Sequence, residues 1–166
     1  FRLTGTDNVL INCTASVIKY IGFFIIAPNN TIDTCKAFFC GSEEKDQSNY
    51  SSAGFYIKGD YTRTSNLLTQ QNQHYGLYAN TNYSYINHHS DGDGQGNNVT
   101  INSYGAYIIG TYNIISVDCC GGRNIDNVVY APKTGVALGN VFDNSIVTII
   151  ASSLSSQYPM TLTNIQ

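Results

Sequence analysis

Acidic side chains that could act as paired catalytic carboxylates gather in the second half of the chain. Glycoside hydrolysis uses two carboxyl groups, about 5 Å apart in retaining enzymes and roughly 6.5 to 9.5 Å apart in inverting ones. On strands stacked at about 4.8 Å, adjacent strands would supply the first spacing and alternate strands the second. The candidate acids, with a candidate charge partner, are Asp91, Asp93, Asp118, Asp126 and Arg123.

Asp118 is the most informative of these acids. Three phrases of similar sequence carry an asparagine at this place, namely Asn12, Asn87 and Asn102. A carboxylate in a row of neutral amides costs free energy unless something compensates for it. Asp118 therefore either acts as an acid or caps a turn beside Arg123, and the sequence leaves both interpretations open.

An elimination or epimerisation at a uronate would need different residues. It requires a base to remove a proton and a cation to stabilise the negative charge that develops. The side chains able to supply them are scattered along the chain: Lys58, Arg63, His74, His88 and Arg123. A lyase or epimerase therefore stays open as an alternative, without an assigned base.

The segment from Asp91 to Gly96 reads D-G-D-G-Q-G and matches the first half of a calcium loop. Oxygen donors at alternate positions, with Gly at the sixth, allow the backbone to bend until the donors converge on one hard cation. The closing Glu is missing, since the twelfth position is Asn102. Asp91, Asp93 and Gln95 are candidate Ca²⁺ ligands, and a Gly-rich turn without metal is the alternative.

Tyrosine supplies a second kind of candidate site. The chain has 13 Tyr and 7 Phe but no Trp. Aromatic rings pack against sugars, and Asn, Gln and Ser add hydrogen bonds. Six tyrosines flank turns or strand ends and are predicted to be exposed and to bind carbohydrate: Tyr50, Tyr61, Tyr75, Tyr83, Tyr85 and Tyr112. Tyr56, Tyr78 and Tyr107 lie within apolar phrases and are predicted to pack in the fold.

A repeated element must position these residues. A Gly followed by large apolar side chains recurs at Gly22, Gly54, Gly76, Gly105 and Gly135, at separations of 32, 22, 29 and 30 residues. Recurrence at about 20 to 50 residues is typical of solenoids, propellers and arrays. Between these phrases lie Asn-initiated segments that alternate apolar and polar residues, at 8–13, 98–103 and 113–119, with looser copies at 31–35 and 83–88. This alternation predicts strands with one buried face.

Stacking of such strands predicts columns of equivalent side chains. One inward column is predicted for the cysteines that close these phrases, Cys13, Cys35 and Cys119. A ladder of hydrogen-bonded amides is predicted just before it, from Asn12, Asn87 and Asn102. Aliphatic residues predicted to face inward are Val9, Ile11, Ile32, Ile115 and Val117.

The two phrases together resemble a known repeat. Asn-Val-x-Ile-x-Asn-Cys/Ser followed by Gly, an apolar residue, Tyr or Phe and Ile is similar to the coil repeat of the pectate-lyase-like superfamily over about residues 7–152. That superfamily of right-handed parallel β-helices includes polysaccharide lyases, polygalacturonases, C5-epimerases and phage tailspikes. The resemblance implies an all-β, right-handed, single-stranded parallel β-helix (a solenoid) of about five to seven coils in one domain spanning residues 1–166. The polygalacturonase catalytic motifs and the acidic metal cluster of pectate lyases are missing, so no catalytic residue carries over.

The composition narrows the resemblance to one kind of member. An uncharged surface rich in Asn, Gly, Ser and Tyr looks most like a phage tailspike or tail-fibre domain. Such a domain implies binding, and in many cases cleavage, of a cell-surface polysaccharide, an extracellular or virion-tail location, and a homotrimer or further domains of the same chain. The alternatives are a secreted lyase or epimerase of the same fold, and a non-catalytic structural shaft or adhesin.

Charge and hydropathy exclude two classes of partner. Charged residues make up 11% of the chain and the net charge is −3, without the basic stripe that a nucleic-acid binder needs. No apolar run approaches the roughly 20 residues of a membrane-spanning helix.

The five cysteines form no C-x-x-C pair and are predicted to be small core residues, although Cys35 and Cys40 could also meet across a turn. We also expect a longer or oligomeric native molecule, because a solenoid exposes apolar coil ends.

Overall fold

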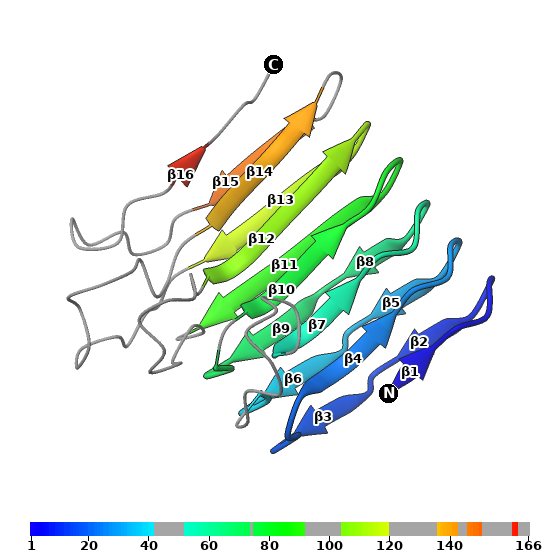
Figure 1. The fold of residues 1–166 in the computed structure, drawn as a ribbon, viewed down its shortest axis with the longest axis vertical. Helices are drawn as coiled ribbons and strands as arrows, with labels where there is room; N and C mark the ends of the chain where they lie inside the picture. The colour runs from blue at the N-terminus through cyan, green and yellow to red at the C-terminus, as the bar shows by residue number, and fades with distance from the viewer. Residues whose placement is uncertain are drawn as a thin grey trace.

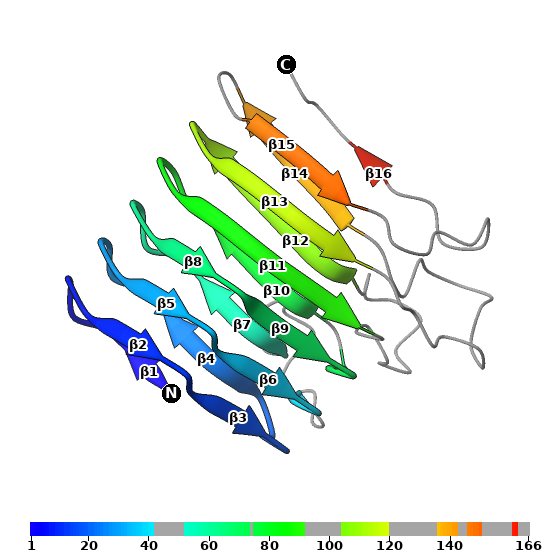
Figure 2. The ribbon, with the colours of Figure 1, turned by 180° about the vertical axis from the view of Figure 1, so that it is seen from behind.

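The computed structural model of the chain describes residues 1–41, 52–73, 75–91, 104–119, 136–142, 146–150 and 161–162. Within these ranges every regular element is a β-strand, and no helix occurs. The strands pair in parallel in two curled sheets, whose order is shown in Figure 1 and, from behind, in Figure 2. The all-β prediction is confirmed, and the stack of parallel strands is compatible with a β-helix-like solenoid.

The first sheet is built from the Gly phrases. Its strands, in spatial order, are β1 (Arg2–Leu3), β4 (Ile21–Ile25), β7 (Ala53–Ile57), β10 (Tyr75–Asn80), β12 (Tyr104–Thr111), β14 (Val136–Phe142) and β16 (Thr161–Leu162). Phe23 pairs with Phe55, Phe55 with Leu77, and Leu77 with Ala106, each one residue after its Gly. The repeat in the sequence is therefore the pairing register of this sheet.

The second sheet begins as two short strands per coil and continues as one long strand. Its short strands are β2 (Val9–Ile11), β3 (Thr14–Ser16), β5 (Thr31–Asp33), β6 (Lys36–Phe38), β8 (Arg63–Ser65) and β9 (Leu67–Gln70). Its long strands are β11 (Tyr85–Asp91), β13 (Ile114–Cys119) and β15 (Ile146–Ile150). A residue with left-handed φ separates each short pair: Asn12 at 52°, Thr34 at 51° and Asn66 at 52°. β11 lacks this extra residue, so it pairs with both β8 and β9.

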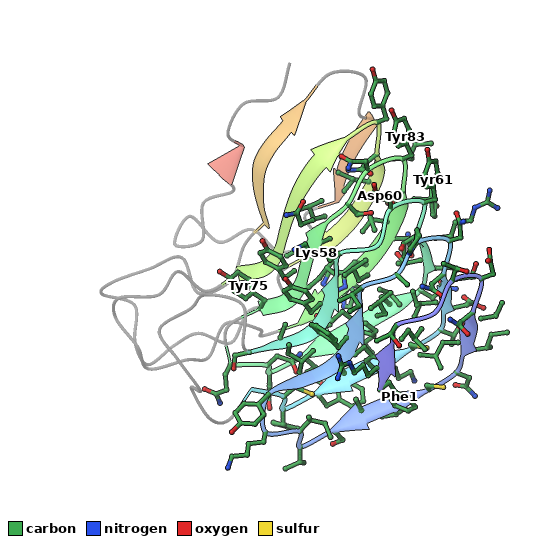
Figure 3. The ribbon with its side chains drawn as sticks, turned by 45° about the vertical axis from the view of Figure 1, so that its right-hand side comes forward. Phe1, Lys58, Asp60, Tyr61, Tyr75 and Tyr83 are labelled. Carbon is green, nitrogen blue, oxygen red and sulfur yellow. The ribbon has the colours of Figure 1, made fainter. Side chains whose placement is uncertain are left out.

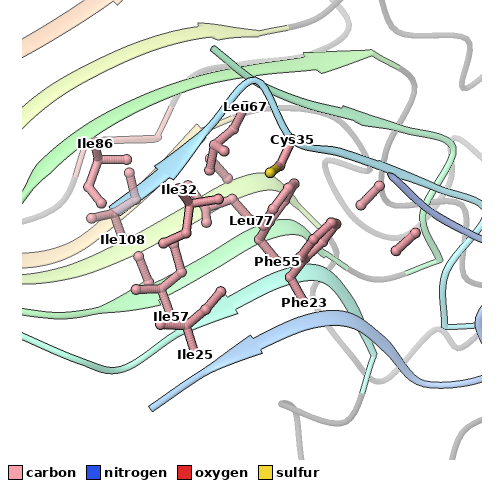
Figure 4. Packing of buried hydrophobic residues seen from close by; sticks show 14 of the residues in the cluster. Phe23, Ile25, Ile32, Cys35, Phe55, Ile57, Leu67, Leu77, Ile86 and Ile108 are labelled. Atoms are coloured by element: carbon pink, nitrogen blue, oxygen red, sulfur yellow. The ribbon is translucent and has the colours of Figure 1, made fainter. Parts of the chain in front are cut away.

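Columns of apolar side chains fill the space between the sheets (Figure 4). Phe23 and Phe55 are fully buried, and their rings stack with centroids 4.4 Å apart. Ile32 and Ile115 face inward as predicted, with 0% and 1% exposure. Other buried members of the core are Ile25, Ile57, Leu67, Leu77, Ile86 and Ile108.

The predicted inward orientation of Val9 and Ile11 is wrong. These side chains are 63% and 59% exposed, because the register pairs Leu10, not its neighbours, with the buried Ile32. Side chains therefore alternate along β2 as predicted, but Leu10 faces the core and Val9 and Ile11 face outward.

The cysteine column is confirmed for Cys13 and Cys35 and wrong for Cys119. Thr14 pairs with Lys36, which aligns the two preceding cysteines. Cys119 instead pairs with Ser90, two residues beyond the position that continues the cysteine column. The extra residue in each early coil accounts for one of these two positions, and the phrase 113–119, which is one residue longer than 8–13, accounts for the other.

The amide ladder also differs from its prediction. Asn12 has the expected left-handed backbone, but Asn87 lies in extended β11 and accepts a hydrogen bond from the Asn66 N–H at 2.9 Å through Oδ1. Asn102 lies outside the described residues. Other buried amide contacts form a separate row, described below.

The thiols should differ in their rates of alkylation. Cys13 is partly exposed, whereas Cys35 and Cys40 are fully buried and form no disulfide with each other. Burial raises the pKa of the Cys35 thiol, and the thiolate is the reactive form. We expect iodoacetamide to modify Cys13 about tenfold or more faster than Cys35 in the native protein, as measured by peptide mass spectrometry. Equal rates for the two thiols would contradict this burial.

Candidate functional site

A column of left-handed residues runs along one edge of the second sheet. These residues, which we call the turn column, stand two positions before β2, β5, β8, β11 and β13. They are Asp7 (φ 59°), Asn29 (59°), Tyr61 (56°), Tyr83 (53°) and Tyr112 (56°). The strands that follow are paired in register, so the column continues from coil to coil. Asp and Asn tolerate this backbone, whereas a bulky side chain is an outlier there.

A row of buried polar side chains holds these turns in place. The Ser84 Oγ accepts a hydrogen bond from the Thr62 N–H at 2.9 Å. The Asn113 Oδ1 accepts from the Ser84 N–H at 2.9 Å, and its Nδ2 donates to the Thr81 carbonyl at 2.7 Å. Asn30 has the same place nearer the N-terminus, where its Nδ2 donates to the Ala27 carbonyl at 2.7 Å. Each turn is therefore fixed by a side chain from its own coil or the next.

Three tyrosines of the turn column stack into a ladder on the outside of the molecule. The ring centroids of Tyr61 and Tyr83 are 5.2 Å apart with 9° between the planes, and those of Tyr83 and Tyr112 are 4.8 Å apart with 6° between them. All three side chains are about half exposed, and Figure 3 shows Tyr61 and Tyr83 one above the other at the edge of the molecule. Stacking covers the ring faces between neighbours, so this tyrosine ladder presents ring edges and hydroxyl groups.

Two adjoining hollows lie between the turn column and the outward side chains that begin each strand. A hollow of about 470 Å³ is lined by Arg63, Tyr83, Ser84, Tyr85, Tyr112 and Ile114. A second, of about 310 Å³, is lined by Asp7, Asn29, Thr31, Tyr61, Arg63 and Tyr83. They share Arg63 and Tyr83, and together we call them the turn groove. Both hollows are open to solvent, so a ligand there would lie along the surface and not inside a closed cavity.

The turn groove crosses the strands and follows the stack. It extends from the coil of Asp7 to that of Tyr112, which is four coil steps of about 4.8 Å each. Arg63 lies where the hollows join, is exposed, and has no described residue pairing with its guanidinium group. A long, hydroxyl-rich ligand could therefore meet five hydrogen-bonding donors at its centre.

The predicted exposure of tyrosines is confirmed at four positions and wrong at one. Tyr61, Tyr83 and Tyr112 form the ladder, and Tyr85 is 43% exposed in the turn groove. Tyr75 is only 4% exposed and packs edge-on against Tyr78, with centroids 5.6 Å apart. Its neighbour in register is Ala53, whose small side chain leaves room for the ring. Tyr50 lies outside the described residues.

Two of the remaining tyrosines behave as predicted. Tyr78 is 3% exposed, and Tyr56 lies between Phe24 and Tyr78 with centroids 5.2 Å and 5.0 Å away. This second aromatic column lies on the face of the first sheet opposite Phe23 and Phe55, where it is partly buried, and is not part of the turn groove. Only the backbone of Tyr107 is described, paired with that of Tyr78.

The candidate acids do not meet the tyrosines in the described structure. Asp91 ends β11, and Asp118 lies in the neighbouring β13 opposite His89. Tyr85 begins β11, six residues from Asp91, which is about 20 Å along an extended strand. Asp93, Gln95, Arg123 and Asp126 lie outside the described residues. Catalysis by the acids and calcium binding therefore stay predictions.

Other predicted chemistry also lacks support in the described part of the chain. His88 is buried, with its Nε2 3.2 Å from the Thr69 Oγ1, so it lies in the core and not at a surface where it could act as a base. Among the described residues no group of three His, Cys, Asp or Glu side chains could hold a metal. The same residues include no helix able to cross a membrane.

Comparisons with known proteins leave the site to be interpreted from its own geometry. No family model, curated protein or solved structure matches the chain. The resemblance to tailspikes and pectate lyases therefore rests on the repeat and the parallel stack.

Proposed function

We propose that this chain binds an extended polysaccharide along the turn groove. The observation that carries the proposal is the tyrosine ladder, whose members occupy positions that suit Asn, Asp or Gly. A left-handed backbone costs roughly 1 to 2 kcal/mol at an ordinary residue. An aromatic pair returns about 0.5 to 1.5 kcal/mol, and three tyrosines form only two pairs. Stacking therefore offsets only part of the backbone cost of the three half-exposed tyrosines, which supports a role for the ladder in ligand binding.

The chemistry of the groove suits a sugar polymer. Tyrosine joins an apolar ring to a hydroxyl, and Arg63, Asn29 and Thr31 add hydrogen-bonding groups along the same line. The coil step is close to the length of one sugar residue, so equivalent side chains can meet successive units of a chain. Asp7 and Arg63 are the charged side chains that line the groove, and the remaining lining agrees with a ligand recognised mainly through hydroxyl groups.

The family and the location belong to the same proposal. The in-register parallel sheets support a right-handed, single-stranded parallel β-helix of the pectate-lyase-like superfamily. A tailspike-like protein of this kind would act outside the cell or on a virion tail, as a homotrimer or with further domains. Its glycan would then be a cell-surface polysaccharide.

Cleavage is a separable part of the proposal. Asp91 and Asp118 lie in neighbouring strands, which supports hydrolysis at the far end of β11 and β13 from the turn groove. The groove would then serve as a binding surface distant from the reacting bond. If the protein is instead a lyase, an epimerase or a non-catalytic shaft, these two aspartates have no role in glycan hydrolysis.

Replacing Tyr83, the middle ring of the ladder, tests the binding proposal. We expect Tyr83→Asn to weaken binding to a recognised bacterial surface polysaccharide by about tenfold or more, since aromatic residues dominate binding energies. Folding stability should change little, because Asn suits the left-handed backbone at this position. Affinity is measured on a polysaccharide panel by calorimetry, and thermal unfolding is followed in parallel.

Phe39→Asn is the matched control. Phe39 also has a left-handed backbone, at φ 52°, and is 50% exposed, but it lines neither hollow. It should keep full affinity. An equal loss in both variants, or no binding to any member of a broad panel, would favour the structural shaft.

A further inference from the structure

The two halves of the turn groove differ in chemistry. The half at the N-terminal end has polar walls, formed by Asp7, Asn29 and Thr31. The other half is walled by aromatic and aliphatic side chains, Tyr83, Tyr85, Tyr112 and Ile114. Arg63 is the single charged group of this second half and stands at the junction. A ligand that carries an apolar group beside a hydrogen-bond acceptor would therefore suit the second half.

Ile114 is the feature of this half that hydroxyl groups alone do not explain. It faces outward from β13 and is 47% exposed, and Tyr85 beside it on β11 is 43% exposed. The same outward row carries Thr31 and Arg63 on the preceding strands. Burying a methyl group against Ile114 and Tyr85 would remove apolar surface from water, which is favourable.

We propose that the apolar half of the turn groove binds the N-acetyl group of an acetamido sugar. This rests on the proposed glycan binding and names its substrate class. The acetyl methyl packs against Ile114 and Tyr85. The acetyl carbonyl oxygen accepts a hydrogen bond from the Arg63 guanidinium, which has no described partner of its own.

A carboxylate sugar fits this half less well. It would pair with Arg63, but the walls at Tyr112 and Ile114 would strip water from a charged group without replacing its hydrogen bonds. In the other half the exposed Asp7 repels a chain that carries a carboxylate on every unit. A neutral group with one methyl and one hydrogen-bond acceptor can contact the apolar walls through the methyl and the Arg63 guanidinium through the acceptor.

Three tetrasaccharides test the inference with the full chain. Tetra-N-acetylchitotetraose and cellotetraose share a backbone and differ in the acetamido group, and tetragalacturonate carries carboxylates. We expect the acetylated chain to bind about ten- to fiftyfold more tightly than either of the others, as one added hydrogen bond and one buried methyl would give. Affinities are measured by calorimetry or by chemical-shift titration.

Ile114→Ser should lower this preference by about three- to fourfold, which is the share that the buried methyl contributes, and Ile114→Thr serves if the first variant folds poorly. The matched control is Val9→Ser, because Val9 begins the equivalent strand β2, is 63% exposed and lines neither hollow. It should keep the full preference. Arg63→Gln retains a donor without the charge, and it should weaken binding of the acetylated chain by less than Ile114→Ser does.

Each other outcome overturns a defined statement. Equal affinity for the acetylated chain and cellotetraose would overturn the acetamido inference and leave glycan binding intact. Tightest binding of tetragalacturonate would replace it with a carboxylate at Arg63. Absence of binding by all three, and by the polysaccharide panel, would overturn the proposed function and the inference together.

Discussion

Phe55→Ala is expected to lower the free energy of unfolding by about 3 to 5 kcal/mol. Phe55 is fully buried, stacks on Phe23 at 4.4 Å and pairs in register with Leu77 on its other side. Backbone hydrogen bonds to both neighbouring strands fix the spacing of the coils, so they cannot close around the space that the ring leaves. The lost burial and the remaining cavity therefore both contribute, as urea denaturation would measure.

Phe1→Ala is the control for this position. Phe1 ends the same aromatic column, with its ring 4.7 Å from that of Phe23, but it is 53% exposed. Its loss should cost roughly 1 kcal/mol, because solvent fills the space. Similar losses in the two variants would show that the column does not pack as a continuous core.

The architecture could be predicted because the repeat in the sequence of a solenoid also gives the register in which its strands pair. Each Gly phrase supplies one strand of the first sheet, and the residues after Gly22, Gly54 and Gly76 pair with one another. The close approach at Gly54 explains the requirement for glycine, since a Cβ there would lie 2.8 Å from the Gly76 carbonyl oxygen. The position of each Gly phrase in the sequence therefore predicts which residues pair in the first sheet.

The direction that side chains face was harder to predict than the strands. Alternation along 9–11 fits either face, and only pairing with Ile32 turns Leu10 inward and Ile11 outward. The left-handed residue at Asn12 then breaks the alternation before Cys13. β13 lacks that extra residue, and the phrase 113–119 is one residue longer than 8–13, so the alignment of the two phrases misplaces Cys119 by two positions.

The sequence predicted that individual tyrosines of the turn groove are exposed, but not that they stack into a ladder. Tyr61, Tyr83 and Tyr112 were each expected at turns, and their stacking follows only when the strands after them are aligned. That alignment is the signal that would also have found Asp7 and Asn29, two residues before their strands. The burial of Tyr75 had no such signal, because it depends on packing against Tyr78 across the sheet surface.

Asn113→Ala is expected to destabilise the fold by about 2 to 4 kcal/mol, because it leaves two buried backbone groups without these hydrogen bonds. Asn113 is fully buried, accepts from the Ser84 N–H and donates to the Thr81 carbonyl. Both bonds reach from one coil to the previous one, beside Tyr112 and Tyr83 of the ladder. The variant should therefore also weaken the near-ultraviolet circular dichroism of stacked tyrosines.

Asn8→Ala is the control for Asn113→Ala, because it also removes an asparagine side chain from the row but not a fully buried one. Asn8 stands in the same row but is only partly buried. Its Nδ2 donates to the Gly5 carbonyl at 2.7 Å within its own turn and to the Asn30 Oδ1 of the next coil at 3.1 Å. Water can replace both bonds, so we expect a loss of about 1 kcal/mol or less and an unchanged tyrosine signal. A large loss of stability in Asn113→Ala with an unchanged tyrosine signal would mean that the buried row stabilises the coils without positioning the ladder. In that case the groove would owe its shape to ring stacking alone, and Tyr83→Asn would disturb Tyr61 and Tyr112 more than Asn113→Ala does.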